Sequence, residues 1–339
     1  MKKILLSLIS VPLILGFITG CGNKIKDGET TIDQGKSEQT KTPEKDTNIP
    51  SQNTKPEKKK VEKKENSSVK RSLKDEILSE NIIGKNITWD GPWQTSDESG
   101  LYEQTTSTGT TYYFRGKPET NYLKFDDALW RIIRVNEDGS IRIASNYGLG
   151  TTDFNSDPYN YLNMYYSNSN AKKEADAWFK KYITGEKAKK VVKGKFCESA
   201  NYENKKSDKK ADVMKNSQYK ASFDCKTDVN NKGILESYVG LITYDEFVFA
   251  GGWYGSDNLP SAYFHFLRYK KSYWTMTPGG ILDDVFQDRI KAWFVDDVGR
   301  GANYIVNTKM GMYIHPVLNL KSDIQIIGSG TLEDPYIVQ

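Results

Sequence analysis

Paired acidic residues are the parts of this 339-residue sequence whose chemistry could most readily support catalysis. Asp245 precedes Glu246, and Asp283 precedes Asp284. Two carboxylates held about 5 to 9 Å apart can act as acid and base on a glycosidic bond. Adjacent residues of a strand point to opposite faces of its sheet, so sequence neighbours do not converge by themselves. Turn and surface positions are therefore favoured for these residues. A cell-envelope glycan hydrolase that uses paired carboxylates is kept as an alternative to the binding function argued below.

Histidine chemistry has no supporting pattern in the sequence. His265 and His315 are the only histidines, and they lie among apolar residues in SAYFHFLRY and YIHPVLNL. These surroundings favour buried, hydrogen-bonded positions over a catalytic base. Neither a G-x-S-x-G nucleophile motif nor an H-E-x-x-H zinc motif is present. We therefore expect no cofactor and no metal site.

Two of the three cysteines lie in a segment rich in lysine, asparagine and aspartate, residues 184–232. In a secreted chain, Cys197 and Cys225 are most simply explained as a disulfide. Closing a loop of about 29 residues would stabilise the fold by roughly 3 to 4 kcal/mol in the chain-entropy model. The bond would hold a segment that has little apolar surface of its own.

The third cysteine, Cys21, ends an N-terminal segment with the features of a targeting signal. Two lysines precede an apolar stretch of about 15 residues, residues 4–18, which is shorter than the roughly 20 residues of a membrane-spanning helix. Ile18, Thr19, Gly20 and Cys21 resemble the lipobox of bacterial lipoproteins. This resemblance implies that residues 1–20 are a removable signal peptide and that an acylated Cys21 anchors the protein to the outer face of the cell membrane. An ordinary secretory signal is the alternative.

Residues 21–75 have the composition of a solvated spacer. No aromatic residue occurs between Phe17 and Trp89, and the segment consists mainly of lysine, glutamate, threonine, serine and proline. Such a segment cannot offset the entropy of ordering, so we predict a disordered tether. The formal net charge of the whole chain is only +4, and we expect no nucleic-acid partner.

Residues 76–339 carry the signals of one folded domain. Apolar runs on both sides of an Asp-Gly turn predict a hairpin over residues 130–143. Helical periodicity predicts a helix over 171–183, and Thr243 with Glu246 forms a capping-box pattern at the start of a second. Further strands are expected in the C-terminal part. The order favours an α+β fold of mainly antiparallel strands with a few short helices.

An aromatic-rich loop is the best candidate for ligand recognition. Trp253 and Tyr254 follow two glycines, and Asp257 and Asn258 come shortly after. A ring offers an apolar face, and a carboxylate or amide offers directional hydrogen bonds, as carbohydrate or peptide recognition requires. The surrounding glycine, aspartate and asparagine indicate an irregular surface loop. Four other tryptophans are expected in the core: Trp130, Trp178, Trp274 and Trp293.

Several longer stretches resemble an uncharacterised extracellular domain family found in surface proteins and lipoproteins of Firmicutes. They are TYYFRGKPETNYLKFDDALWRIIRVNEDGSIRI, VGLITYDEFVFAGG, SYWTMTPGG and HPVLNLKSDIQIIGSGTLEDPYIV. The resemblance implies a C-type-lectin-like fold. The family has arginine before Pro-Val where this chain has His315, so an arginine contact is not carried over. The function expected is a lipid-anchored, non-enzymatic binding or adhesion module for an extracellular carbohydrate, peptide or protein.

Overall fold

The structure is a computed structural model, and it describes one compact unit of the chain. The described residues are 70–80, 82–85, 99–199, 221–228, 230–253, 265–282, 288–308 and 310–339. The predicted signal peptide, Cys21 and nearly all of the predicted tether lie outside them. The domain starts earlier than residue 76, because strand β1 (Arg71–Ser72) pairs with β18 (Gln325–Ile327) and helix α1 (Leu73–Leu78) buries Leu73 and Ile77.

The largest sheet contains twelve strands within the described residues. Eight follow the order β1-β18-β19-β5-β6-β4-β3-β2, while β7 joins β6 to β17, and β17 also pairs with β9 and β12. Most neighbours are antiparallel, and the pairs β19–β5 and β2–β3 are parallel. The remaining bounds are β2 Ile82–Lys85, β3 Gly100–Thr106, β4 Gly109–Arg115, β5 Tyr122–Phe125, β6 Ala128–Val135, β7 Ile141–Ser145, β9 Val191–Val192, β12 Val239–Gly240, β17 Val317–Leu320 and β19 Tyr336–Val338.

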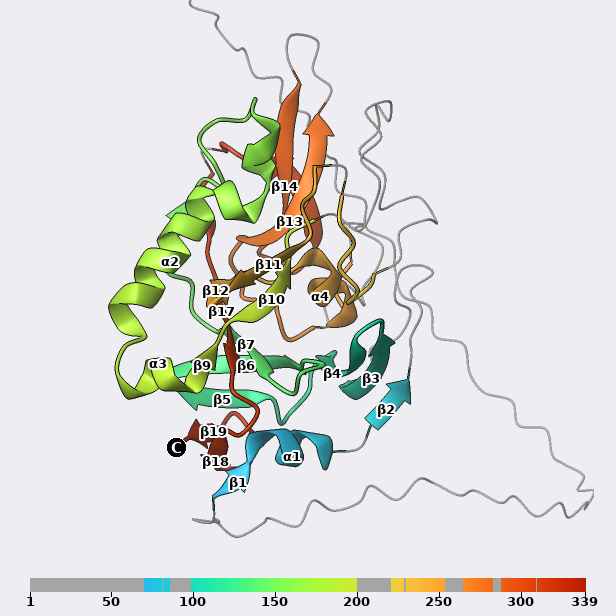
Figure 1. Ribbon diagram of the computed structural model, residues 1–339, viewed down its shortest axis with the longest axis vertical. Helices are drawn as coiled ribbons and strands as arrows, with labels where there is room; N and C mark the ends of the chain where they lie inside the picture. Colours follow the sequence, from blue (N-terminus) through green and yellow to red (C-terminus); the bar gives the residue numbers. More distant parts are fainter. Residues whose placement is uncertain are drawn as a thin grey trace, which may run out of the picture. The chain divides into compact units, whose positions relative to one another are not determined.

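A second sheet has the order β15-β14-β13-β16-β8, and β10 with β11 forms a separate two-stranded antiparallel sheet (Figure 1). Within the second sheet only β13 and β16 run parallel among the described pairs. The bounds are β8 Thr151–Thr152, β10 Gly194–Cys197, β11 Ile234–Ser237, β13 Tyr273–Leu282, β14 Arg289–Val295, β15 Gly301–Ile305 and β16 Met312–Tyr313. The predicted class, α+β with mainly antiparallel strands and few short helices, is therefore confirmed.

The helices are short, and their ends follow the sequence signals. Helix α2 (Asn170–Tyr182) matches the predicted 171–183, with Ser169 as its N-cap. Helix α4 (Tyr244–Phe249) has the predicted capping box and is buried throughout. It contacts β4 of the large sheet and β13 of the second sheet. Within the described residues, the other helical segments are α3 Glu186–Lys190 and two 3₁₀ turns, Tyr161–Met164 and Tyr166–Asn168.

The hairpin of β6 and β7 lies at the centre of the large sheet. Trp130, Ile132 and Ile133 are buried, as are Ile141 and Ile143 opposite them. Gly139 takes a positive φ of 81° in the connecting turn, a conformation that glycine adopts without strain. The predicted hairpin is confirmed. It places residues of β6 directly beside residues of β7.

Among the described residues, no helix has the length and apolar character needed to cross a membrane.

Candidate functional site

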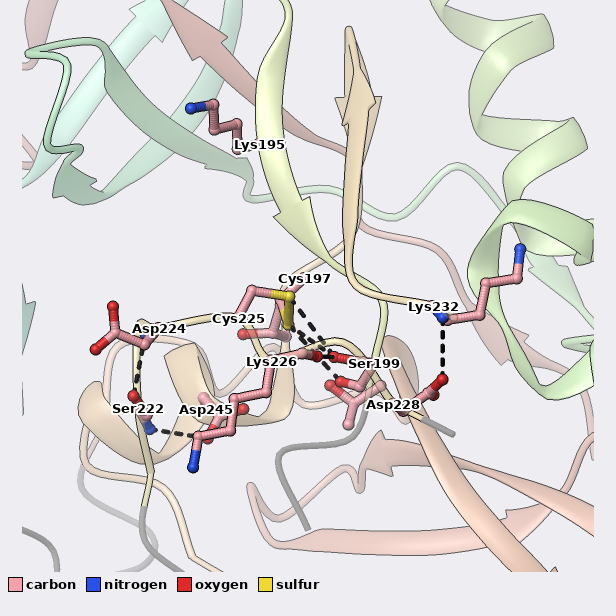
Figure 2. The surroundings of a disulfide bond; sticks show 12 residues. Lys195, Cys197, Ser199, Ser222, Asp224, Cys225, Lys226, Asp228, Lys232 and Asp245 are labelled. Atoms are coloured by element: carbon pink, nitrogen blue, oxygen red, sulfur yellow. Dashed lines mark hydrogen bonds between the residues drawn. A yellow bond between two sulfur atoms is a disulfide. The ribbon is translucent and has the colours of Figure 1, made fainter. Parts of the chain in front are cut away.

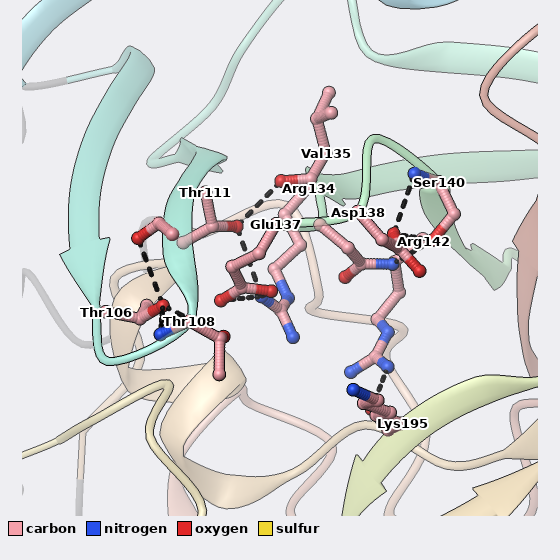
Figure 3. Close-up of polar contacts among 12 residues, drawn as sticks. Thr106, Thr108, Thr111, Arg134, Val135, Glu137, Asp138, Ser140, Arg142 and Lys195 are labelled. Carbon is pink, nitrogen blue, oxygen red and sulfur yellow. Dashed lines mark hydrogen bonds and ion pairs between the residues drawn. The ribbon is translucent and has the colours of Figure 1, made fainter.

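Two arginines face each other across the central hairpin. A register shift in β6 between Ile132 and Arg134 places Arg134 directly opposite Arg142 of β7. Figure 3 shows both side chains projecting from the hairpin in the same direction. Like charges directly opposite each other destabilise a sheet, so this pairing requires an anion between them.

Glu246 supplies that anion from the first turn of α4. Its Oε1 accepts a hydrogen bond from Arg142 Nη1 at 2.5 Å and lies 3.4 Å from Arg134 Nε. Its Oε2 accepts the backbone N–H of Thr243 at 2.9 Å. The capping box that starts α4 therefore also orients the carboxylate. Arg134, Arg142 and Glu246, here called the buried triad, are all largely shielded from solvent.

The guanidinium of Arg142 is satisfied on every nitrogen. Nε donates to Asn319 Oδ1 at 3.1 Å, and Nη2 donates to the backbone oxygen of Lys195 at 2.5 Å. The ring of Phe196 lies beneath it, with its centroid 4.4 Å from the guanidinium carbon. Arg142 is thus held by hydrogen bonds and by a cation–π contact.

Arg134 is held less completely. Its Nη1 donates to Thr111 Oγ1 at 3.1 Å and lies 3.4 Å from both oxygens of Glu137 (Figure 3). The ring of Phe223 covers it at 4.6 Å. Burial and the charge of Arg142 lower the pKa of Arg134, against the opposing effect of Glu246.

Burial alone would raise the pKa of Glu246. The charges of Arg142 and Arg134 and the hydrogen bond from Thr243 outweigh that effect and hold the pKa below its usual value. A carboxyl group with a lowered pKa stays ionised at neutral pH and is a poor general acid. Glu246 therefore has the electrostatics of a structural counter-ion.

The predicted disulfide is present and forms one wall beside the triad. Cys197 and Cys225 are joined, with their Cα atoms 5.4 Å apart. Figure 2 shows Ser199 beside the sulfur atoms, and its hydroxyl donates to the backbone oxygen of Lys226 at 2.5 Å. The bond fixes the end of β10 to the segment that carries Phe223, the residue that covers Arg134.

A cavity of about 250 Å³ lies between the hairpin turn, β10, residues 222–225 and the start of α4; we call it the disulfide cavity. Several carboxylates line it, and each has contacts within the protein. Asp224 accepts from the backbone and hydroxyl of Ser107, and Asp245 accepts the N–H of Ser222 at 3.1 Å. The predicted pair Asp245 and Glu246 thus lies at a cavity wall, but both residues are buried and hydrogen-bonded. Asp283 and Asp284 lie outside the described residues.

A larger cavity, of about 590 Å³, lies elsewhere on the domain and is here called the Arg131 pocket. Its lining combines the loop after β4, the start of β5, β6, residues 265–268 and the turn between β18 and β19; the residues are Lys117, Pro118, Glu119, Tyr122, Arg131, His265, Phe266, Arg268, Thr331, Leu332 and Glu333. Its volume falls within the range of small-molecule sites, about 300 to 1,000 Å³.

Arg131 occupies a fixed position in this pocket. Its Nε donates to Asn121 Oδ1 at 2.8 Å, and Nη2 donates to the same oxygen and to the backbone oxygen of Pro118. The guanidinium carbon lies 3.8 Å from the ring centroid of Tyr122, its neighbour across β5 and β6, and 5.2 Å from that of Phe266. Arg131 is only 6% exposed.

The turn of residues 328–334 closes this side of the pocket. Ser329 donates its N–H to the backbone oxygen of Asp334, and Gly330 has a φ of 79°. A Cβ at Gly330 would lie 2.4 Å from the ring of Tyr336, so only glycine fits there. The C-terminal Gly-Ser-Gly is thus a closing turn.

Both histidines have the buried positions expected from the sequence. His265 Nε2 is 2.8 Å from the backbone oxygen of Gly299, and His315 Nδ1 is 3.0 Å from that of Ser145. Burial lowers the pKa of each to about 4. Within the described residues, no group of three or more histidine, cysteine or acidic side chains could hold a metal ion.

The surface position expected for Trp253 is not observed. Its side chain is 8% exposed and belongs to the core, and its backbone oxygen accepts the N–H of Gly301 at 2.8 Å. Gly252 serves close packing, because a Cβ there would lie 2.2 Å from the ring of Phe247, and Gly251 has a φ of 105°. The glycine pair therefore turns the chain inward after α4. Tyr254, Asp257 and Asn258 lie outside the described residues.

The buried arginines were not identified as site residues from the sequence. A signal was available, because ALWRIIRV places Arg131 and Arg134 in an otherwise apolar central strand. Charged residues in such a run must be paired or face a cavity.

No protein-family model, no curated protein and no solved structure matches this chain. The structure itself shows an α+β domain with a buried triad and a pocket that contains a fixed arginine.

Proposed function

We propose that this chain is a lipid-anchored protein of the cell surface whose folded domain binds an extracellular ligand. The ligand class is a carbohydrate, a peptide or a protein segment. The observation that carries the proposal is the Arg131 pocket, which combines a volume suited to a ligand with two aromatic rings and a fixed cation. Such a mixture of apolar surface and a few oriented polar groups is typical of recognition sites.

Binding is preferred to glycan hydrolysis because of the state of Glu246. Both of its oxygens accept hydrogen bonds from the protein, and its pKa is lowered. A hydrolytic acid needs a raised pKa, and a nucleophile needs an oxygen that can reach the sugar. Glu246 meets neither need.

The sequence supports the anchoring half of the proposal. Ile18, Thr19, Gly20 and Cys21 fit the lipobox pattern, and the fold starts by Arg71. An acylated Cys21 would hold the domain at the outer face of the membrane through the intervening residues. We also infer a C-type-lectin-like arrangement, on the sequence resemblance and the α+β class of the fold.

A glycan and peptide array probed with the purified full-length protein tests the binding function. We expect selective retention on a small set of ligands, with Arg131→Met reducing it at least about tenfold through loss of a charged contact. Lys321→Met, which removes an exposed cation outside both cavities, is the matched control and should bind as the natural protein does. Equal binding to all ligands, or to none, would count against the proposal.

A further inference from the structure

Arg131 is a buried cation without a carboxylate partner in the described part of the chain. Its hydrogen-bond partners are the amide oxygen of Asn121, the backbone oxygen of Pro118 and the phenol of Tyr122, all of them uncharged. Its Nη1 donates to no carboxylate, amide or carbonyl oxygen of the described residues. Burying a charge is costly unless an opposite charge compensates it.

The buried triad shows how the same fold treats its other central arginines. Arg134 and Arg142 share the carboxylate of Glu246, and Arg134 has Glu137 in addition. Arg131 lies only three residues before Arg134 in the same strand, yet it faces the large cavity instead of a carboxylate. Within the described part of the chain, a counter-charge for Arg131 would therefore have to come from the cavity side.

The charges of the described residues that line the pocket favour a ligand with a single negative charge. Lys117, Arg131 and Arg268 are positive, and Glu119 and Glu333 are negative, which leaves three minus two, or +1. His265 adds no charge at neutral pH, because burial lowers its pKa to about 4. The two glutamates are exposed at the rim and would repel a dianion more than a monoanion.

We propose that the Arg131 pocket binds the carboxylate of a ligand whose adjoining apolar face packs against Tyr122 and Phe266. This inference rests on the proposed binding function and names the chemical group that is recognised. The carboxylate accepts hydrogen bonds from Nη1, since the hydrogen bonds to Asn121 and Pro118 occupy the rest of the guanidinium. The same hydrogen bonds and the Tyr122 ring fix the arginine before the ligand arrives, which reduces the entropy cost of binding.

Pairs of acids and their neutral analogues test this inference on the full-length protein. Acetate is compared with acetamide, benzoate with benzamide, and glucuronate with glucose. All measurements are made at constant ionic strength and neutral pH. Binding is measured directly by ligand-observed nuclear magnetic resonance, and the stabilisation it causes by thermal unfolding. We expect at least one acid to bind about tenfold or more tightly than its neutral analogue, because a charged hydrogen bond is lost in the amide or sugar.

Variants place the effect at Arg131. Arg131→Met should abolish the preference for the acid, Arg131→Lys should keep part of it, and Lys321→Met, which removes an exposed cation outside both cavities, should change it less than about threefold. The comparison of acid and neutral probes on the natural protein needs no variant, so a folding defect of Arg131→Met does not obscure it.

The outcomes separate this inference from the binding function. Equal affinity for acids and for their neutral analogues overturns the carboxylate site. In that case, selective binding in the array would still support the proposed binding function. No measurable binding of any acid also overturns it. Phenyl phosphate binding more tightly than benzoate overturns the assignment of a monoanion.

Discussion

Replacing Glu246 with glutamine is expected to lower the free energy of unfolding by about 3 to 5 kcal/mol, the usual cost of breaking a buried ion pair. The neutral amide would leave Arg134 and Arg142 opposite each other without a shared anion. Both guanidiniums are almost fully buried, so solvent would compensate little of the lost charge. Glutamine is close to glutamate in size, so the loss reports charge and hydrogen bonding rather than a cavity.

Urea unfolding of the natural protein and the variant measures this effect. Glu137→Gln is the matched control, because Glu137 contacts the same arginine at 3.4 Å but lies nearer the surface. It should cost less, about 1 kcal/mol, because Glu137 is partly exposed to water and does not bridge the two arginines. A loss at Glu246 no larger than the loss at Glu137 would contradict the assignment of Glu246 as the counter-ion.

The same variant should also change the acid limb of the stability curve. The pKa of Glu246 lies below its ordinary value of 4.5 in the folded protein. Its contribution is therefore fully present above pH 4.5 and is lost as the pH falls through the lower folded value. The difference in stability between the natural protein and Glu246→Gln should shrink as the pH falls through this window.

Removing the disulfide is expected to cost roughly 3 to 4 kcal/mol, the chain-entropy value for a loop of this size. Cys197 and Cys225 are separated by 28 positions, and the segment ending at Cys225 places Phe223 against Phe249, with ring centroids 4.0 Å apart. Without the bond, ordering this segment costs more entropy, and Arg134 loses its aromatic cover.

Urea unfolding of the double variant Cys197→Ser and Cys225→Ser checks the disulfide prediction. The reduced natural protein should match the double variant, and the reductant should leave the double variant unchanged, which is the internal control. Unfolding midpoints that agree within error for the oxidised natural protein and the double variant would contradict a stabilising role.

Local features of the fold could be predicted from the sequence because neighbouring residues determine them. The Asp-Gly turn gave the β6–β7 hairpin, and Thr243 with Glu246 gave the start of α4. The disulfide followed from the cysteine count and the character of the surrounding segment.

Features that depend on contacts distant in sequence could not be predicted in this way. Trp253 was expected in a surface loop, because glycines usually mark turns, yet Gly252 is required by the packing of Phe247. The boundary at residue 76 was too late, because Arg71–Ser72 pairs with a strand near the C-terminus. The polar composition of this segment concealed the buried Leu73.

The candidate sites were even less accessible from the sequence. Glu246 was identified as a possible catalytic carboxylate, but its partners lie in a hairpin about 100 positions earlier (104 between Arg142 and Glu246). The Arg131 pocket joins β5 and β6 to residues 265–268 and to the C-terminal turn. Only the tertiary fold brings these segments together.

Fatty-acid labelling in a Gram-positive bacterium tests most directly the central claim, that the domain is held at the cell surface by an acylated Cys21. The natural protein should carry the label and remain with the membrane, and Cys21→Ala should be unlabelled. The double variant Cys197→Ser and Cys225→Ser should keep the label, because those cysteines form a disulfide within the domain. Absence of label from the natural protein, or equal label on Cys21→Ala, would contradict the claim.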